Sequence, residues 1–174
     1  MLFMPITDAT KWLARFWQDK IFAAGINDEN NYTGLNEPDR YYTGYVGEIC
    51  FRNLLILFDK RYVFKPRFDG YPDAHDFLVY LAGDPASLSL NVKTMNREFS
   101  TDVMMPESQF QKYRHDFYVG TRVLGDYAEL AFDGWTTYGI LAREKPRTHK
   151  NKILTRQIPR RKLRPIETLL EMIA

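Results

Sequence analysis

A strict alternation of polar and apolar side chains over residues 87–94 limits the folds open to this chain more than any other feature. The polar members are Ser87, Ser89, Asn91 and Lys93, and they alternate with Leu88, Leu90, Val92 and Thr94. Because successive side chains of a β-strand point to opposite faces, the pattern predicts a strand with one apolar and one polar face. Such a strand needs neighbouring strands and a layer that covers its apolar face.

The flanking segments predict what pairs with this strand and what covers it. Helical spacing predicts a helix over 8–24, capped by Thr7 or Asp8, and a second helix over 41–58. The apolar face of the first helix is predicted to consist of Trp12, Leu13, Phe16, Trp17 and Ile21. Strands are predicted at 62–68, 75–81, 117–124, 127–132 and 154–158, and shorter helices follow Pro106, span 136–144 and follow Pro165. This order predicts an α/β fold with a central mixed sheet flanked by helices.

The composition fits one domain. The chain has 174 residues, of which 45% are hydrophobic and 26% charged, and this suffices for one sizeable core. We expect a single domain over 1–174, with a core at about 41–144 and a basic segment over 143–174. A single cysteine, Cys50, rules out an intramolecular disulfide. Since no apolar run approaches ~20 residues and no signal-peptide pattern begins the chain, we expect a cytoplasmic protein with no membrane partner.

The near-neutral charge of +2 hides a strong asymmetry. Residues 143–164 contain ten basic residues and one acidic residue, a net charge of +9, whereas the rest of the chain carries −7. Clustered Lys and Arg side chains are typical of polyanion-binding proteins, although a solvated basic loop has the same composition. The predicted contacts to nucleic acid are Arg147, Lys150, Lys152, Arg156, Arg160, Arg161, Lys162 and Arg164.

A candidate site lies where the predicted hairpin 75–94 brings three polar residues together. Asp76 stands at the start of an apolar strand, and Asn91 and Lys93 share the polar face of the next strand. Carboxylate and amide oxygens can ligate a divalent metal, and an ammonium group can stabilise developing negative charge. An ordinary Asp–Lys ion pair at the end of a sheet would show the same residues. Asp73 is an alternative to Asp76.

These residues and the order of elements resemble the PD-(D/E)xK nuclease superfamily, the restriction-endonuclease-like fold. In that family a helix carries a Glu, a β-hairpin presents Asp and then (D/E)xK, and a helix and further strands follow. The resemblance spans about residues 41–130. It matches Glu48 to the helix Glu, Asp76 to the Asp and Asn91-Val92-Lys93 to the tripeptide. It implies an αβββαβ core and hydrolysis of DNA with Mg²⁺, or Mn²⁺ in its place.

The chain departs from the family at Asn91, where the family has an acid. An amide oxygen brings no charge, so Mg²⁺ beside one carboxylate would be held weakly. Some restriction enzymes of this superfamily take their acid from the next helix, and Glu107 has a similar placement. Acids are also common in a helix's first turn for purely structural reasons. Asp76, with Glu107 or Glu48, is therefore the expected metal-binding set, with Asn91 as a neutral ligand. Lys93 would either orient the attacking water or stabilise the charge of the transition state.

Three functions remain open from the sequence. The first is a metal-dependent DNA endonuclease, for which a homodimer would suit cleavage of both strands. The second is a nucleic-acid-binding protein with a disabled nuclease site, and the third is an assembly protein whose basic tail docks an acidic partner. The chain has no Gly-rich phosphate-binding motif, so no nucleotide cofactor is expected. Its histidines and its cysteine lack zinc-ligand spacing.

Overall fold

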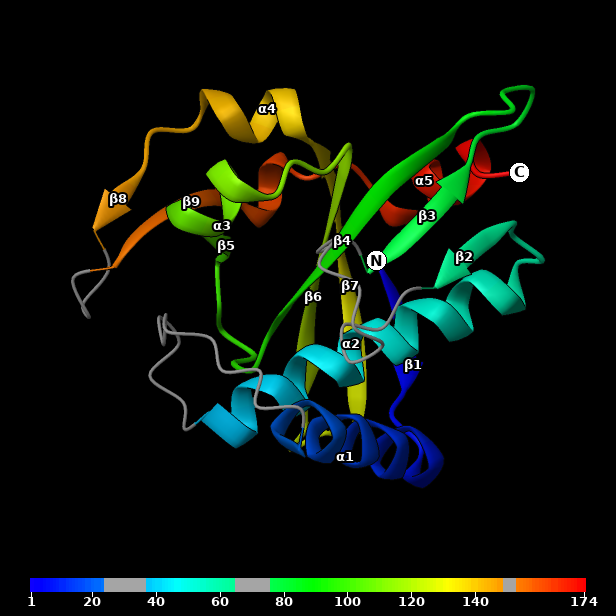
Figure 1. Ribbon diagram of the computed structural model, residues 1–174, viewed down its shortest axis with the longest axis vertical. Coiled ribbons are helices and arrows are strands. Elements are labelled where there is room, and N and C mark those ends of the chain that lie inside the picture. The colour runs from blue at the N-terminus through cyan, green and yellow to red at the C-terminus, as the bar shows by residue number, and fades with distance from the viewer. Residues whose placement is uncertain (24–36, 65–75, 149–152) are drawn as a thin grey trace.

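A computed structural model describes residues 1–23, 37–64, 76–148 and 153–174. Its centre is a mixed six-stranded sheet in the spatial order β1-β7-β6-β4-β3-β2 (Figure 1). The strands are β1 (Leu2–Pro5), β2 (Tyr62–Phe64), β3 (Phe77–Tyr80), β4 (Ser87–Met95), β6 (Phe117–Leu124) and β7 (Glu129–Thr137). β2, β3 and β4 form an antiparallel meander, and β6 runs parallel to β4. The predicted central mixed sheet is confirmed.

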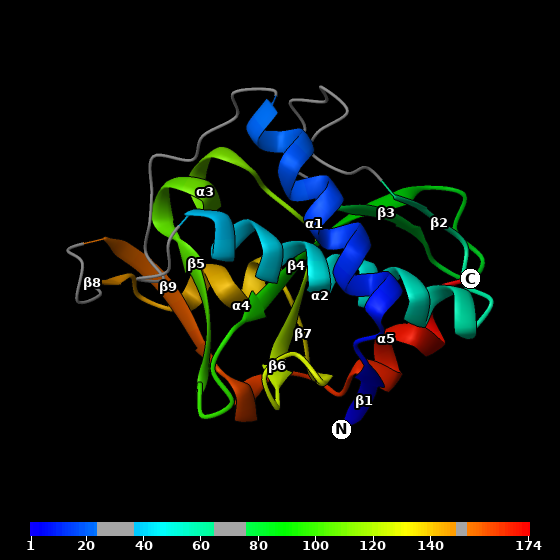
Figure 2. The same cartoon turned by 90° about the horizontal axis from the view of Figure 1, so that it is seen from below.

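Two helices form successive layers on one face of this sheet. α2 (Glu37–Leu57) lies against the sheet, and α1 (Asp8–Ala23) lies across the outer side of α2 (Figure 2). The main core unites apolar residues of both helices with alternate residues of β4 and β6, among them Leu90, Val92 and Val119. Gly47 lets α2 approach closely, because a Cβ atom there would collide with Thr94 Oγ1 on β4.

A second, three-stranded sheet covers part of the opposite face. It has the order β5-β9-β8 and contains β5 (Asp102–Pro106), β8 (Arg147–Thr148) and β9 (Leu154–Pro159). Two short helices, α3 (Glu107–Lys112) and α4 (Tyr138–Arg143), accompany it. Apolar residues of these elements make a second core with Tyr118 of β6. The polar face of β4 therefore looks toward this second sheet.

The C-terminal end of the chain returns to the main sheet. A short 3-10 turn (Arg160–Lys162) leads to α5 (Ile166–Met172), whose apolar residues join the main core. Trp135 and Arg164 exchange two backbone hydrogen bonds of 2.9 Å. Gly134 has a φ of +136°, and a Cβ atom there would collide with the Arg164 carbonyl oxygen. Glycine is thus needed where β7 meets the returning chain.

Most predicted elements are present, but several bounds differ and some strands were not predicted. α2 begins at Glu37, four residues early, because Pro38 is tolerated in a first turn. α3 has 6 residues instead of about ten, and β1, β5 and β8 were not predicted. In the strand predicted at 62–68, β2 covers 62–64, and the remainder lies outside the described residues.

The predicted buried face of the first helix is wrong in part. Trp12 and Phe16 are 66% and 41% exposed. α1 instead buries Thr10, Ala14, Trp17, Gln18 and Ile21, a narrower stripe that packs on α2. A helix buries only the residues that face its neighbours, here mainly α2, so Trp12 and Phe16 on the outer side of α1 stay exposed.

Candidate functional site

The hairpin of β3 and β4 places Asp76 beside the polar face of β4. Phe77 pairs with Leu90, so Asp76 and Asn91 are opposite each other at the next position of this antiparallel register. Asp76 Oδ2 accepts a hydrogen bond of 2.6 Å from the backbone N–H of Val92. This bond fixes one carboxylate oxygen against β4. The predicted neighbourhood of Asp76 and Asn91 is present.

Lys93 lies on the same face of β4 as Asn91. In the parallel register, Asn91 is beside Tyr118 and Lys93 is beside Gly120 on β6. Lys93 Nζ donates to Gln109 Oε1 of α3 at 3.5 Å. Its side chain also lines a small cavity of about 10 Å³, with room for about one water molecule, between the two sheets. Lys93 is thus held where the second sheet and α3 meet β4.

Helix α2, which carries Glu48, lies on the other face of the sheet. Glu48 follows Gly47 on α2, and α2 crosses β4 at Thr94, one residue beyond Lys93. Thr94 belongs to the face opposite Asn91 and Lys93, because side chains alternate along a strand. The structure therefore brings the helix that carries Glu48 to the level of Lys93, but from the opposite face of β4.

The Glu107 carboxylate is held by Arg156 of β9. Arg156 Nε lies 2.6 Å from Glu107 Oε2, and Arg156 Nη2 donates to Oε1 at 2.8 Å. Gln111 also donates to Oε1, at 2.7 Å. Burial works to raise the pKa of Glu107, but the hydrogen bonds from Arg156 and Gln111 and the Arg156 charge outweigh it and lower the pKa. The Glu107 carboxylate therefore forms an ion pair with Arg156 that joins α3 to β9.

The side-chain oxygens near Asp76 therefore supply only part of the ligand set that a metal ion needs. Among the described residues, no three His, Cys, Asp or Glu side chains are grouped so that they could hold a metal. The hairpin offers one carboxylate, Asp76, and one amide, Asn91. Such a pair suits Mg²⁺ when substrate phosphates and water complete its coordination, as is common for this ion. Asp73 lies outside the described residues.

Three cations of the basic segment have acidic partners among the described residues. Arg156 pairs with Glu107, as described above. Arg160 Nη1 lies 3.6 Å from Asp133 Oδ1. Lys162 Nζ lies 2.6 Å from Glu144 Oε1. Arg164 stacks over the Trp135 ring at 4.9 Å. Arg147 and Arg161 are exposed. Lys150 and Lys152 lie outside the described residues.

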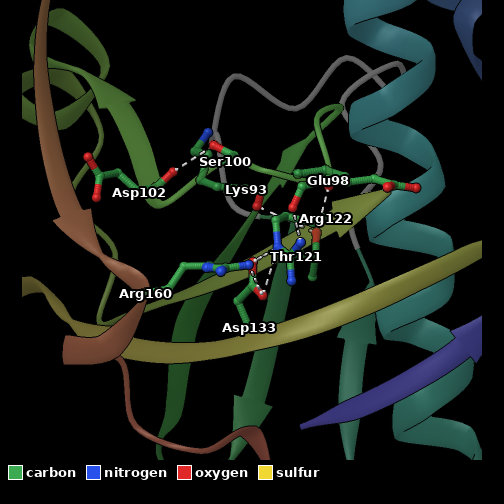
Figure 3. Close-up of polar contacts among 9 residues, drawn as sticks. Lys93, Glu98, Ser100, Asp102, Thr121, Arg122, Asp133 and Arg160 are labelled. Carbon is green, nitrogen blue, oxygen red and sulfur yellow. Dashed lines mark hydrogen bonds and ion pairs between the residues drawn. The ribbon is translucent and has the colours of Figure 1, made fainter. Parts of the chain in front are cut away.

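Sequence reasoning missed a buried arginine–carboxylate cluster at the far end of β4. The side chain of Asp133 is 0% exposed and lies between Arg122 and Arg160 (Figure 3). Arg122 Nε donates to both Asp133 oxygens, at 3.0 and 2.8 Å, and its Nη1 donates to the Glu98 carbonyl. The predicted strand 127–132 ends one residue before Asp133, whereas β7 continues to Thr137 and carries Asp133 beside Arg122. The cluster anchors the loop after β4.

No described helix is both long and apolar enough to cross a membrane. No protein-family model, curated protein or solved structure matches this chain. The likeness to PD-(D/E)xK nucleases thus depends on the residues and the order of elements alone.

Proposed function

We propose that this protein is a divalent-metal-dependent DNA endonuclease of the PD-(D/E)xK type. The observation that carries the proposal is the hairpin that places Asp76 opposite Asn91 and puts Lys93 on the same face, two residues along β4. The described order α2–β2–β3–β4–α3–β6 agrees with the αβββαβ core that the resemblance implies, with β5 inserted before α3.

The chemistry assigned to each residue follows from its charge. A Mg²⁺ ion held by Asp76 and Asn91 would supply a Lewis acid at the scissile phosphate. Lys93 would bind a phosphate oxygen and stabilise the negative charge that develops on it. The Val92 N–H keeps Asp76 oriented toward this position. Because only one formal charge faces the metal, we expect weak metal binding until DNA phosphates are present.

A nucleic-acid-binding protein with a disabled site is the second candidate. Two observations favour it: the neutral Asn91, and the Glu107 carboxylate that is already paired with Arg156. Both candidate functions have the same arrangement of residues. They differ only in whether Asp76 and Asn91 hold a metal ion well enough for catalysis.

The deciding experiment restores the missing charge. Purified wild-type protein, Asn91→Asp, Asp76→Ala and Lys93→Ala are incubated with supercoiled plasmid in Mg²⁺, Mn²⁺ or EDTA. An active nuclease cuts with metal, loses about 100-fold or more in rate on either Ala substitution, and binds metal more tightly as Asn91→Asp. Thermal unfolding of each variant controls for loss of the fold.

The outcomes separate the candidates. Cleavage by Asn91→Asp alone would establish a disabled nuclease site. Metal-dependent cutting that survives both Ala substitutions would remove Asp76 and Lys93 from the site. No cutting by any variant, with folded proteins and salt-sensitive DNA binding, would leave a binding protein without nuclease chemistry.

A further inference from the structure

Helix α1 presents two large aromatic side chains to solvent. Trp12 is 66% and Phe16 41% exposed, and their rings stack with a centroid distance of 5.6 Å and an interplanar angle of 9°. The other two tryptophans, Trp17 and Trp135, are buried. α1 forms the outer layer on this side of the described molecule (Figure 2). Exposure of a stacked aromatic pair has a hydration cost that a partner would relieve.

Charged residues stand at each end of this pair, one helical turn away. Asp8 precedes Trp12 by four residues, and Lys20 follows Phe16 by four, with its ammonium 5.3 Å from the centre of the Phe16 ring. All four side chains therefore follow one ridge of residues spaced by four. We call Asp8, Trp12, Phe16 and Lys20 the α1 ridge. Along the ridge, an acidic side chain is followed by two aromatic side chains and then by a basic one.

The α1 ridge is complementary to an antiparallel copy of itself. We consider a two-fold axis that crosses the exposed ridge midway between Trp12 and Phe16, so that the numbers of two facing residues add up to 28. Trp12 then faces Phe16 of the second copy, and Asp8 faces its Lys20. Ridges of this spacing run parallel when two helices cross at about −50°, the commonest packing in globular proteins. A two-fold symmetric dimer uses the same patch on both copies. The ridge can pair with itself in this way because its acidic end would face the basic end of the second copy.

We propose that the α1 ridge is the interface of a homodimer with two-fold symmetry. The mixed charge argues against a nucleic acid as occupant, because Asp8 and the exposed Asp19 would face phosphates. One helix from each copy falls short of the ~1,600 Å² of a standard interface, so the dimer is weak and depends on concentration. The inference does not depend on the nuclease proposal.

Sedimentation velocity from about 5 to 400 µM tests the interface. Wild-type protein should shift from monomer to dimer across this range, and Trp12→Ala combined with Phe16→Ala should weaken association about tenfold or more. The fluorescence of Trp12 should shift to the blue over the same range, since the other tryptophans are already buried. Phe99→Ala is the matched control, because Phe99 is 80% exposed but lies outside α1.

Charge reversal tests the symmetry itself. Asp8→Lys alone places two ammonium groups opposite each other, because position 8 faces Lys20 of the second copy. Lys20→Asp alone places two carboxylates opposite each other, so each variant should associate about threefold or more weakly. An equimolar mixture should recover association, because both pairs are then of opposite charge. Mixing leaves each helix unchanged, so recovery is independent of any effect on stability.

Three results would overturn the proposal. They are a monomer at every concentration, a dimer that the double alanine variant leaves intact, and a mixture of the two charge variants that associates no better than either alone. Weaker DNA binding by the double alanine variant, with an unchanged monomer mass, would assign the ridge to nucleic acid instead.

Discussion

Glu107 shows how one residue can fit a functional pattern and yet serve the structure. Its position at the start of α3 matches that of a migrated metal ligand, but its carboxylate is bound by Arg156 and Gln111. Arg156 also donates to the carbonyl oxygens of Ala142 and Glu144, at 2.8 Å each. This one arginine therefore ties β9 to α3 and to the end of α4.

We predict that Glu107→Gln lowers the free energy of unfolding by about 1–3 kcal/mol at pH 7, because the arginine loses its charged acceptor. Urea unfolding measures this change. If Glu107 were a metal ligand beside other carboxylates, Glu107→Gln would instead raise the free energy of unfolding in EDTA, because it would remove one of several mutually repelling charges.

The same pair predicts a pH dependence. The folded state lowers the pKa of Glu107 below its ordinary value of 4.5. The contribution of the pair is therefore complete above pH ~4.5 and is lost as the pH falls through the lower folded-state pKa. The difference in unfolding free energy between wild-type protein and Glu107→Gln should shrink between pH 7 and pH 3. A difference that stays constant would show that the carboxylate is not ionised in the pair.

At the scale of elements, two glycines of α2 offer a matched test of how the helix meets the sheet. A Cβ atom on Gly44 would meet nothing within 4 Å, whereas one on Gly47 would collide with Thr94. We predict that Gly44→Ala raises the free energy of unfolding by about 0.5–1 kcal/mol, through helix propensity alone. Gly47→Ala should lower it by about 2 kcal/mol, because the helix must move away from β4.

Urea unfolding of the two variants checks the sign of each change. Thr94→Ala should recover part of the Gly47→Ala loss, because it removes Oγ1, the atom nearest to the added methyl group. Equal effects of both glycine substitutions would contradict the close approach of α2 to β4.

The elements that sequence reasoning found are those whose patterns are local. The alternation over 87–94 predicted β4 and its two faces, and the turn before it predicted the β3–β4 hairpin. β5 was missed because its five residues, Asp102–Pro106, pair with β9 about fifty positions away. Pairing between distant segments depends on tertiary packing and leaves little local signal.

The same limit applies to the candidate site. The juxtaposition of Asp76 and Asn91 follows from a local hairpin, so the sequence could predict it. The pairing of Glu107 with Arg156 joins residues 49 apart and depends on the second sheet. The sequence therefore predicted where the Asp76 carboxylate lies, but it did not predict the ion pair between Glu107 and Arg156.

At the scale of the whole molecule, folding pairs part of the basic segment with acidic residues of the body. Among the described residues, Arg156 and Arg160 of the basic segment pair with Glu107 and Asp133 of the body, and Lys162 pairs with Glu144 inside the segment itself. Arg147 and Arg161 remain exposed on β8 and the 3-10 turn. A DNA-binding surface on this side must depend on such residues more than on the total charge.

We predict that Arg147→Ala and Arg161→Ala each reduce the slope of log affinity for DNA against log salt concentration by about 1, because each removes one phosphate contact. Neither should change the melting temperature. Arg160→Ala removes the same charge but leaves buried Asp133 with one arginine fewer, so it should also lower stability. Lys11→Ala on α1, across the six-stranded sheet, is the control. If Lys11→Ala reduced the slope as much as Arg161→Ala, binding would follow net charge alone and would not be localised to this surface.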